Sequence, residues 1–250
     1  VRDPTATSCR RGAIRPPACG CVAPPVSLPT PQRDVLGRYR LGTVLGRGGA
    51  ATVYRATDLA TGEVVAVKEI PVGLEMARRA GAEVRAASRL EHPGIVRLLD
   101  FGEDTFAAYL VSELVDGASL SVRLRERSLN DAEYVTIIAD VLDGLAHAHE
   151  RGVTHRDVKP ANILVSGPGT DSERIMLADF GIARRLGEVS SLTGTNMTVG
   201  TVAYSAPEQL TADEQIDGRA DQYALAATAF QLLTGSPPFQ HSNPAIVISQ

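Results

Sequence analysis

Apolar and polar residues alternate in short segments through the first part of the chain. Residues 39–45 (YRLGTVL), 51–58 (ATVYRATD) and 64–70 (VVAVKEI) read as three strands, joined by a glycine-rich turn and by the turn ATGE. Two more short strands are expected at residues 97–101 and 107–113. The pattern predicts an antiparallel meander in this part of the chain.

Helical spacing governs most of the remaining chain. Residues 75–90 place five apolar side chains one helical turn apart, and His-Pro-Gly at 92–94 ends this segment. Further helices are expected at residues 120–125, 131–151 and 221–233. A small sheet-bearing part followed by a larger helical part predicts an α+β fold.

The first 36 residues differ from the rest in composition. They hold seven of the 15 prolines and all three cysteines, Cys9, Cys19 and Cys21. Proline at this density cannot build a core, so residues 1–36 are expected to be a disordered extension and residues 37–250 the folded domain. The absence of cysteine after Cys21 fits a domain that folds in a reducing, cytoplasmic environment.

Charge and hydropathy exclude two classes of partner. The formal net charge is −4 and the pI is about 5.8, so the overall charge gives no indication of a positive surface that would bind nucleic acid. The longest apolar candidate, Tyr223–Leu233, is far shorter than the roughly 18 residues that span a membrane. We therefore expect neither nucleic-acid binding nor a membrane segment in this chain.

Lysine is rare and its two positions are informative. The chain has 23 arginines but only two lysines, Lys68 and Lys159. Lysine provides a compact point charge, whereas arginine provides a planar fork. Chance survival at two exposed sites is the simplest explanation, but the residues around each lysine favour a chemical one.

Two segments of the first part could contact phosphate. Gly46 and Gly48 lie in a glycine-rich turn between two strands, where bare amides can approach an anion, although an ordinary hairpin explains them equally well. Lys68 ends an apolar strand, and Glu83 on the following helix is a candidate partner. Such a pair could hold the α- and β-phosphates of a nucleotide; the alternative is a surface lysine beside any nearby acid.

The segment HRDVKPAN, residues 155–162, combines charged and amide side chains with Asp179 further on. Asp157 could accept a hydroxyl proton and Lys159 could neutralise a moving phosphoryl group. Asn162 and Asp179 offer the hard oxygen ligands that magnesium prefers. Each residue alone could be a helix cap or a salt bridge, but together they are the components of phosphoryl transfer.

From Tyr39 to Phe239 these segments resemble the protein kinase family. The resemblance rests on the glycine turn with Val53, VAVK ending at Lys68, Glu83 on the next helix, HRDVKPAN, DFG at 179–181, APE at 206–208, and Asp221 in GRADQYAL. Lys159 and Thr201 are similar to serine/threonine rather than tyrosine kinases, and several segments resemble actinobacterial members. The resemblance implies a bilobal fold with an N-lobe at 37–112, a hinge at 113–117 and a C-lobe at 118–250 that lacks its last helices.

The implied function is an ATP-dependent serine/threonine protein kinase that uses Mg²⁺ or Mn²⁺; the alternative is a truncated, inactive nucleotide-binding scaffold. Implied partners are protein substrates with Ser or Thr, and a homodimer for trans-autophosphorylation. The implied ATP-binding residues are Leu45, Gly46, Gly48, Val53, Ala66, Lys68, Glu113, Val115 and Leu164. The implied catalytic residues are Asp157, Lys159, Lys68 and Glu83, with Asn162 and Asp179 as metal ligands. Thr193 and Thr195 are implied phosphorylation sites, and Arg156, Phe180, Thr201, Glu208 and Asp221 regulatory residues.

Four further expectations concern individual side chains. Ser112 is in the position that resembles the family's gatekeeper and is small, so we expect an enlarged pocket behind the adenine; the alternative is that a neighbouring side chain fills it. Arg156 is expected to be unpaired until a phosphate arrives. Glu208 is expected to lack the arginine partner that the last helices carry. For the same reason the apolar residues Leu225, Phe230 and Leu233 are expected to be partly uncovered.

Overall fold

The computed structural model describes residues 33–48, 51–71, 81, 84–170, 172–181, 202–210 and 216–240. The chain divides into two units, residues 1–31 and 32–250, and everything described below belongs to the second unit. Of the disordered extension predicted at residues 1–36, residues 1–32 lie outside the described residues.

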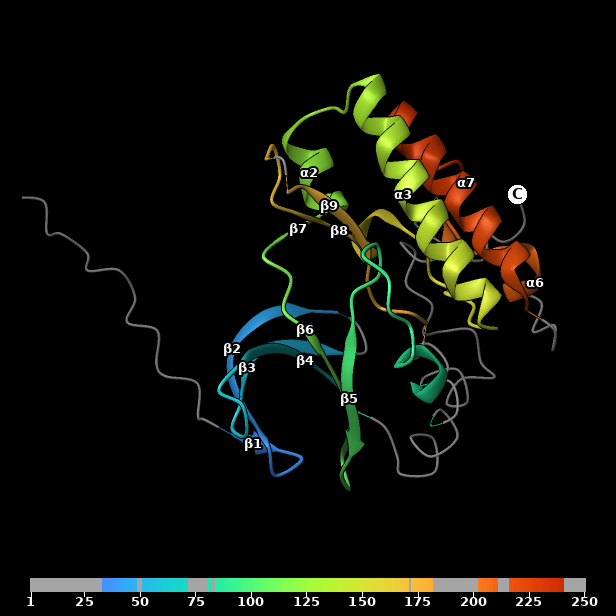
Figure 1. Cartoon of the computed structure of the whole chain (residues 1–250). Coiled ribbons are helices and arrows are strands. Elements are labelled where there is room, and N and C mark those ends of the chain that lie inside the picture. Colours follow the sequence, from blue (N-terminus) through green and yellow to red (C-terminus); the bar gives the residue numbers. More distant parts are fainter. Residues whose placement is uncertain are drawn as a thin grey trace, which may run out of the picture. The chain divides into compact units, whose positions relative to one another are not determined.

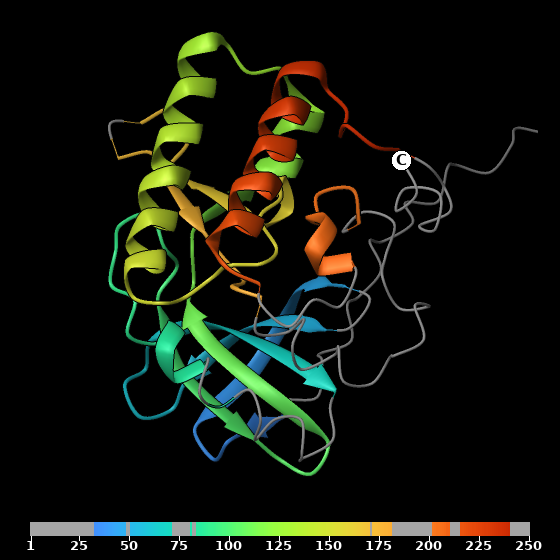
Figure 2. The ribbon, with the colours of Figure 1, turned by 90° about the vertical axis from the view of Figure 1, so that its right-hand side faces the viewer.

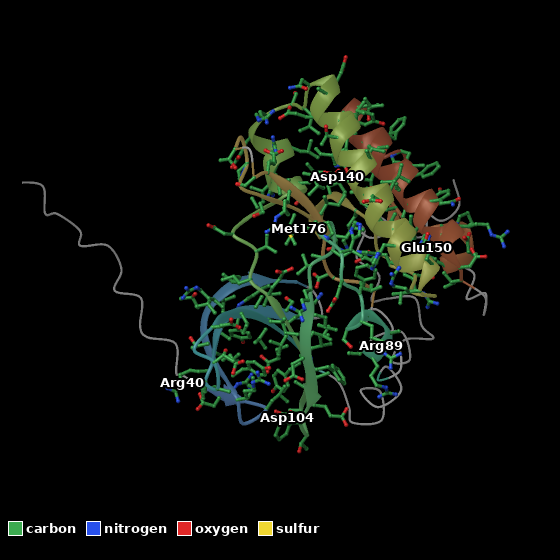
Figure 3. The ribbon with its side chains drawn as sticks, viewed as in Figure 1. Arg40, Arg89, Asp104, Asp140, Glu150 and Met176 are labelled. Carbon is green, nitrogen blue, oxygen red and sulfur yellow. The ribbon has the colours of Figure 1, made fainter. Side chains whose placement is uncertain are left out.

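A six-stranded antiparallel sheet forms the first part of this unit (Figure 1). Its strands are β1 (Asp34–Val35), β2 (Tyr39–Arg47), β3 (Thr52–Asp58), β4 (Val64–Pro71), β5 (Leu98–Glu103) and β6 (Ala107–Glu113). Their order is β1-β2-β3-β4-β6-β5, and every neighbouring pair is antiparallel. Figure 3 labels Arg40 on β2 and Asp104 at the turn between β5 and β6. The five strands expected from alternation are confirmed to within two residues at each end.

Strand β1 corrects the predicted extent of the disordered extension. Asp34 and Val35 pair with β2, and Val35 is buried. Leu36 packs so tightly over β5 that a Cβ added to Gly102 would lie 2.4 Å from a Leu36 methyl group. The ordered structure therefore begins before residue 37, because Val35 and Leu36 cover apolar surface of the sheet.

Alternation along β4 assigns its two faces. Val65 and Val67 are buried in a cluster on one face of the sheet. The intervening Ala66 and the following Lys68 are half-buried on the opposite face. The sequence VVAVK thus buries valine on one side while it presents a lysine on the other.

The second part combines a small sheet with helices. The sheet contains β7 (Gly117–Ser119), β8 (Ile163–Ser166) and β9 (Arg174–Leu177). The helices are α2 (Leu120–Glu126), α3 (Asp131–Glu150), the 3₁₀ turn η1 (Pro160–Asn162), α6 (Pro207–Leu210) and α7 (Gly218–Thr234). Both views show α3 and α7 side by side, and α3 also packs against β9 (Figures 1 and 2). The α+β prediction is confirmed, although the three short strands were not anticipated.

Local sequence signals explain where the two long helices begin and end. Asn130 and Glu133 form a capping box at the start of α3, each side chain accepting the other residue's backbone N–H. Asp217 caps α7 by accepting the Arg219 N–H, which starts the helix three residues before the prediction. Gly235, with φ of 81°, ends α7 in the left-handed conformation that favours glycine.

The predicted helix at 75–90 is described at residue 81 and at 84–90. Residues 81 and 84–87 are helical, whereas 88–90 are not, so the helix ends three residues before the predicted end. On α7, Phe230 and Leu233 are 47% and 65% exposed, as expected. Leu225 is instead 5% exposed and belongs to the main hydrophobic core, so the expectation that it is uncovered is wrong. The helix turns Leu225 inward and the other two side chains outward.

One hydrophobic core joins the two parts of the unit. It includes Ile70 and Leu110 from the large sheet, Leu145 from α3, Ile163 from β8 and Leu225 from α7. Figure 3 shows the side chains of α3, with Asp140 and Glu150 labelled. Among the described helices, none is both long enough and apolar enough to cross a membrane.

Candidate active site

The loop before η1 brings three polar side chains together. Lys159 Nζ donates to both oxygens of the Asp157 carboxylate, at 3.0 and 2.8 Å. Asn162 Nδ2 donates to the Asp157 carbonyl at 2.8 Å and to its Oδ2 at 2.9 Å. The carboxylate of Asp157 is therefore held in one orientation by a cation and an amide.

His155 connects this loop to the segment after β9. Its imidazole is buried, and its Nε2 donates to the Ala178 carbonyl at 3.0 Å. Its Nδ1 accepts the Asp157 N–H at 3.3 Å, and its ring lies 4.5 Å from the Phe180 ring between centroids. Burial lowers the pKa of His155, against the opposing effect of Asp221 and Asp157. The ring is thus a neutral imidazole, protonated on Nε2.

Asp221, in the first turn of α7, holds the same loop from the other side. Its carboxylate is fully buried and accepts the His155 N–H at 2.8 Å, the Arg156 N–H at 2.6 Å and the His149 ring Nε2 at 2.7 Å. A Cβ on Gly218 would lie 2.8 Å from the His149 ring, so only glycine fits there. Asp221 therefore braces the loop by two hydrogen bonds and joins it to α3 by a third.

Arg156 is more constrained than expected. Its backbone has φ of 66°, in the left-handed region that non-glycine residues rarely adopt. Its guanidinium donates to the Ile216 carbonyl at 3.4 Å. The expectation that Arg156 is unpaired in the absence of phosphate is wrong, because the loop preceding α7 supplies an acceptor.

Asp179 lies where the segment after β9 turns toward the large sheet. Ala178 N–H donates to the Asn162 carbonyl at 2.9 Å, and Gly181 N–H donates to the His155 carbonyl at 2.7 Å. Between them Asp179 has φ of 60°, and its Oδ1 lies 2.7 Å from Lys68 Nζ on β4. The structure thus brings Lys68 and Asp179 together across the two parts of the unit.

The donor chemistry around Asp157 fits a hard divalent cation. Asn162 directs its amide nitrogen at Asp157, so its Oδ1 points away and remains available as a ligand. Asp179 supplies a carboxylate that is 41% exposed. No group of three or more His, Cys, Asp or Glu side chains in the described residues could hold a metal by itself. Two oxygen ligands are what Mg²⁺ needs when phosphate oxygens and waters complete its shell.

The residues expected to contact ATP line the same side of the strands. Across the sheet, Val53 pairs with Lys68 and Ala66 pairs with Ser112. Val53, Ala66 and Leu164 are half-buried, whereas their strand neighbours Val65 and Ile163 are buried. These apolar side chains are exposed enough to receive a flat ring.

The remaining predicted nucleotide contacts come from the glycine turn and the segment after β6. Leu45 is 50% exposed, Gly46 has open space around its Cβ position, and Gly48 N–H closes the turn on the Ala51 carbonyl at 2.8 Å. Glu113 Oε1 accepts the Arg97 N–H at 2.8 Å, which fixes the start of the segment, and Val115 is half-buried.

Several predicted residues lie outside the described residues. These are Glu83, Thr193, Thr195 and Thr201. Glu208 is described and is not without a partner, but this does not test the expectation that it lacks the arginine of the last helices. Phe180 is buried against His155, and its regulatory role stays a prediction.

The segment 202–210 contributes two contacts that sequence reasoning missed. Tyr204 hydroxyl donates to the Gln231 side chain on α7. Gln209 Nε2 donates to the Arg156 carbonyl at 2.9 Å, and its Oε1 accepts the Ala206 N–H at 3.0 Å. The sequence offers only one signal for these contacts, which is that Gln209 directly follows Ala-Pro-Glu.

A cavity of about 310 Å³ lies elsewhere. Its walls come from Glu91, His92, Pro93, Ile95, Arg97, Glu113, Arg174 and Met176. It shares only Glu113 with the residues expected to bind ATP, and none with the Asp157 cluster. We therefore do not place the nucleotide in it.

Comparisons with known proteins agree with this geometry. A family model described as the protein kinase domain matches residues 39–250. The serine/threonine-protein kinase PknF of Mycobacterium tuberculosis is 47% identical over 230 residues, which are 89% of this chain and 48% of PknF. The chain spans half or less of the length of the curated relatives that it matches.

Solved structures are similar as well. The PknI kinase domain of Mycobacterium tuberculosis superposes with a TM-score of 0.66 at 34% identity, covering 82% of this chain and 76% of that one. Rad53 1–466 in complex with AMP-PNP gives a TM-score of 0.65 at 29% identity, covering 83% of this chain and 51% of that one.

Proposed function

Because the chain belongs to the protein kinase family, we propose that it transfers the γ-phosphate of ATP to serine or threonine hydroxyls of proteins. One observation carries the proposal. The carboxylate of Asp157 is held by Lys159 and Asn162 in the same site in which Asp179 meets Lys68. The likeness to PknF, a serine/threonine-protein kinase, supports the choice of hydroxyl.

ATP would bind with adenine among Val53, Ala66 and Leu164, beside the hinge at 113–117. Lys68 would leave Asp179 in part and contact the α- and β-phosphates as a point charge. Asp179 and Asn162 Oδ1 would hold Mg²⁺. The bound ion would neutralise charge on the phosphates and on the transferring group.

Asp157 would orient the substrate hydroxyl and accept its proton. Lys159 now donates to Asp157 through its ammonium group, which has three donors. It can therefore keep one contact with the carboxylate while it donates to the γ-phosphate. This arrangement joins the base and the phosphoryl group through one cation, and positioning of that kind accounts for most of the catalysis in this reaction class.

Regulation would act through the segment between Asp179 and residue 208. Thr193 and Thr195 would be autophosphorylated, in a homodimer, and the added phosphate would compete with Ile216 for Arg156. Thr201 would contact the catalytic loop near Lys159. These roles rest on the resemblance of the sequence to the family, since the three threonines lie outside the described residues.

The competing function is an inactive nucleotide-binding scaffold. It predicts ATP binding without transfer, whereas Asp157, Lys159, Asn162, Asp179 and Lys68 are all present and favour transfer. The test is radiolabel transfer from γ-labelled Mg-ATP to a generic protein substrate, with a thermal melt with and without Mg-ATP. Labelling of serine or threonine by the unmodified protein, and its loss in Asp157→Asn, would support the kinase. An ATP-shifted melt with no label in the unmodified protein supports the scaffold.

A further inference from the structure

The residue before the proposed base has an unusual backbone. Arg156 has φ of 66°, and it immediately precedes Asp157. Left-handed conformations in non-glycine residues cost free energy and persist only where surrounding contacts impose them. The contacts that impose this one therefore determine where Asp157 lies.

Two side chains hold the two peptide groups of Arg156. Asp221 accepts its N–H at 2.6 Å from α7, and Gln209 donates to its carbonyl at 2.9 Å from α6. The two holders come from different helices and act on opposite sides of the strained Cα. A third contact also reaches the peptide between Arg156 and Asp157, since its N–H donates to His155 Nδ1, but at 3.3 Å this hydrogen bond is longer than the one from Gln209.

Gln209 is itself fixed in orientation. Its Oε1 accepts the N–H of Ala206, a fully buried residue, at 3.0 Å. One end of the amide is thereby an acceptor and the other a donor, so the nitrogen faces the Arg156 carbonyl. Only glutamine combines this length with both functions, because glutamate has no donor and asparagine is one methylene shorter.

We propose that Gln209 is a positioning residue, which clamps the left-handed Arg156 peptide and so aims the Asp157 carboxylate. The inference rests on the proposed kinase function. Through Gln209 the segment 202–210 is joined to the catalytic loop, and through Tyr204 it is joined to Gln231 on α7. Disturbance of the 202–210 segment would therefore be transmitted to the base through the Gln209 amide.

The primary test compares Gln209→Glu with Gln222→Glu. The first change keeps the acceptor for Ala206 but turns a carboxylate toward the Arg156 carbonyl, whereas Gln222 is an exposed glutamine on α7 that undergoes the same change. We expect kcat to fall about ten- to a hundredfold for Gln209→Glu, with KM for ATP unchanged, and no change for Gln222→Glu. Gln209→Met, of similar volume and without charge, should lower kcat in the same way.

A second measurement separates a clamp from a merely structural role. If Gln209 acts by holding a strained backbone, Arg156→Gly should relieve the strain and make the clamp dispensable. Gln209→Glu should then lower kcat less than about threefold in the Arg156→Gly background. An equal loss in both backgrounds would overturn the proposal.

Backbone hydrogen exchange tests whether Gln209 holds the loop, independently of activity. The amides at 155–159 should exchange about tenfold faster in Gln209→Glu than in the unmodified chain or in Gln222→Glu. Unchanged exchange with unchanged kcat would refute the clamp. If the unmodified chain transfers no phosphate, but Gln209→Glu still exchanges faster than the unmodified chain, the proposed function is refuted and the clamp is supported.

Discussion

The two sides of the candidate site are held in different ways. On the base side, Asp157 is positioned through a network whose anchors, His155 and Asp221, are fully buried. On the nucleotide side, Lys68 and Asp179 are 17% and 41% exposed at their side chains and hold each other by one ion pair. Partly exposed pairs of this kind are weak and readily exchange partners.

This difference suggests a division of roles. The base is oriented by contacts within the chain, so it needs no ligand to reach its position. The lysine and the metal-binding carboxylate neutralise each other until a phosphate and a cation provide new partners for both. Variants on the two sides should therefore separate chemistry from nucleotide binding.

The largest expected effects come from the two carboxylates. Asp157→Asn and Asp179→Asn should each reduce phosphotransfer by at least about a thousandfold, because charge stabilisation and positioning supply most of the rate. Asp157→Asn should keep the shift of the thermal melt by Mg-ATP, and Asp179→Asn should lose it. Near-normal transfer by Asp179→Asn would show that the metal assignment is wrong.

Removal of the buried anchor should cost stability as well as rate. Asp221→Asn leaves donors from the loop facing an amide, and breaking such a buried charged network costs about 3 kcal/mol of unfolding free energy. Denaturant unfolding measures this loss. Asp217→Asn is the matched control, since asparagine caps a helix as well as aspartate does. Equal stability losses for the two variants would contradict the bracing role.

Substitution of Ser112 tests the nucleotide side of the site alone. Ser112 faces Ala66 across the sheet, and both side chains are small. A bulky purine analogue should inhibit the unmodified chain about tenfold more strongly than Ser112→Met, because the methionine side chain would fill the pocket that receives the bulky group. KM for ATP should change little. Equal inhibition of both proteins would mean that another side chain already fills the space.

The smallest expected effect is a dependence of stability on pH. Burial lowers the pKa of His155 below its ordinary value of about 6.5, so the unfolded chain binds a proton more readily than the folded one. Stability is then complete above pH about 6.5 and decreases as the pH falls below that value. In His155→Gln, the free energy of unfolding should fall less steeply as the pH decreases from about 6.5 into mild acid. Denaturant unfolding at several pH values measures this dependence. An unchanged slope would contradict the assignment of a neutral buried ring.

Sequence alone predicted the parts of the fold that carry strong periodic patterns. The strands of the large sheet and the helix α3 have alternation or caps that mark their ends. The short strands β7, β8 and β9 have three or four residues and too little pattern to be recognised. Strand β1 was missed because the prolines before it dominate the composition, while two apolar residues suffice to cover the sheet.

The candidate site was likewise predicted only in part from the sequence. Motif spacing identified Asp157, Lys159, Asn162 and Asp179, because these residues lie within or directly after recognisable segments. It could not identify Gln209 as a partner of Arg156, since the contact joins residues 53 positions apart through a side-chain amide. It also could not foresee that Lys68 pairs with Asp179, which depends on how the two parts of the unit pack.

The most direct test of this account is a pair of crystal structures, one without ligand and one with Mg²⁺ and a non-hydrolysable ATP analogue. We predict that Lys68 Nζ moves from Asp179 Oδ1 to phosphate oxygens, while the hydrogen bonds of Asp221 to the backbone of residues 155 and 156 and of Asn162 to Asp157 remain within their present lengths. An ion pair that stays closed with the nucleotide bound, or a catalytic loop that rearranges on binding, would contradict the division between a fixed base and an exchangeable nucleotide side.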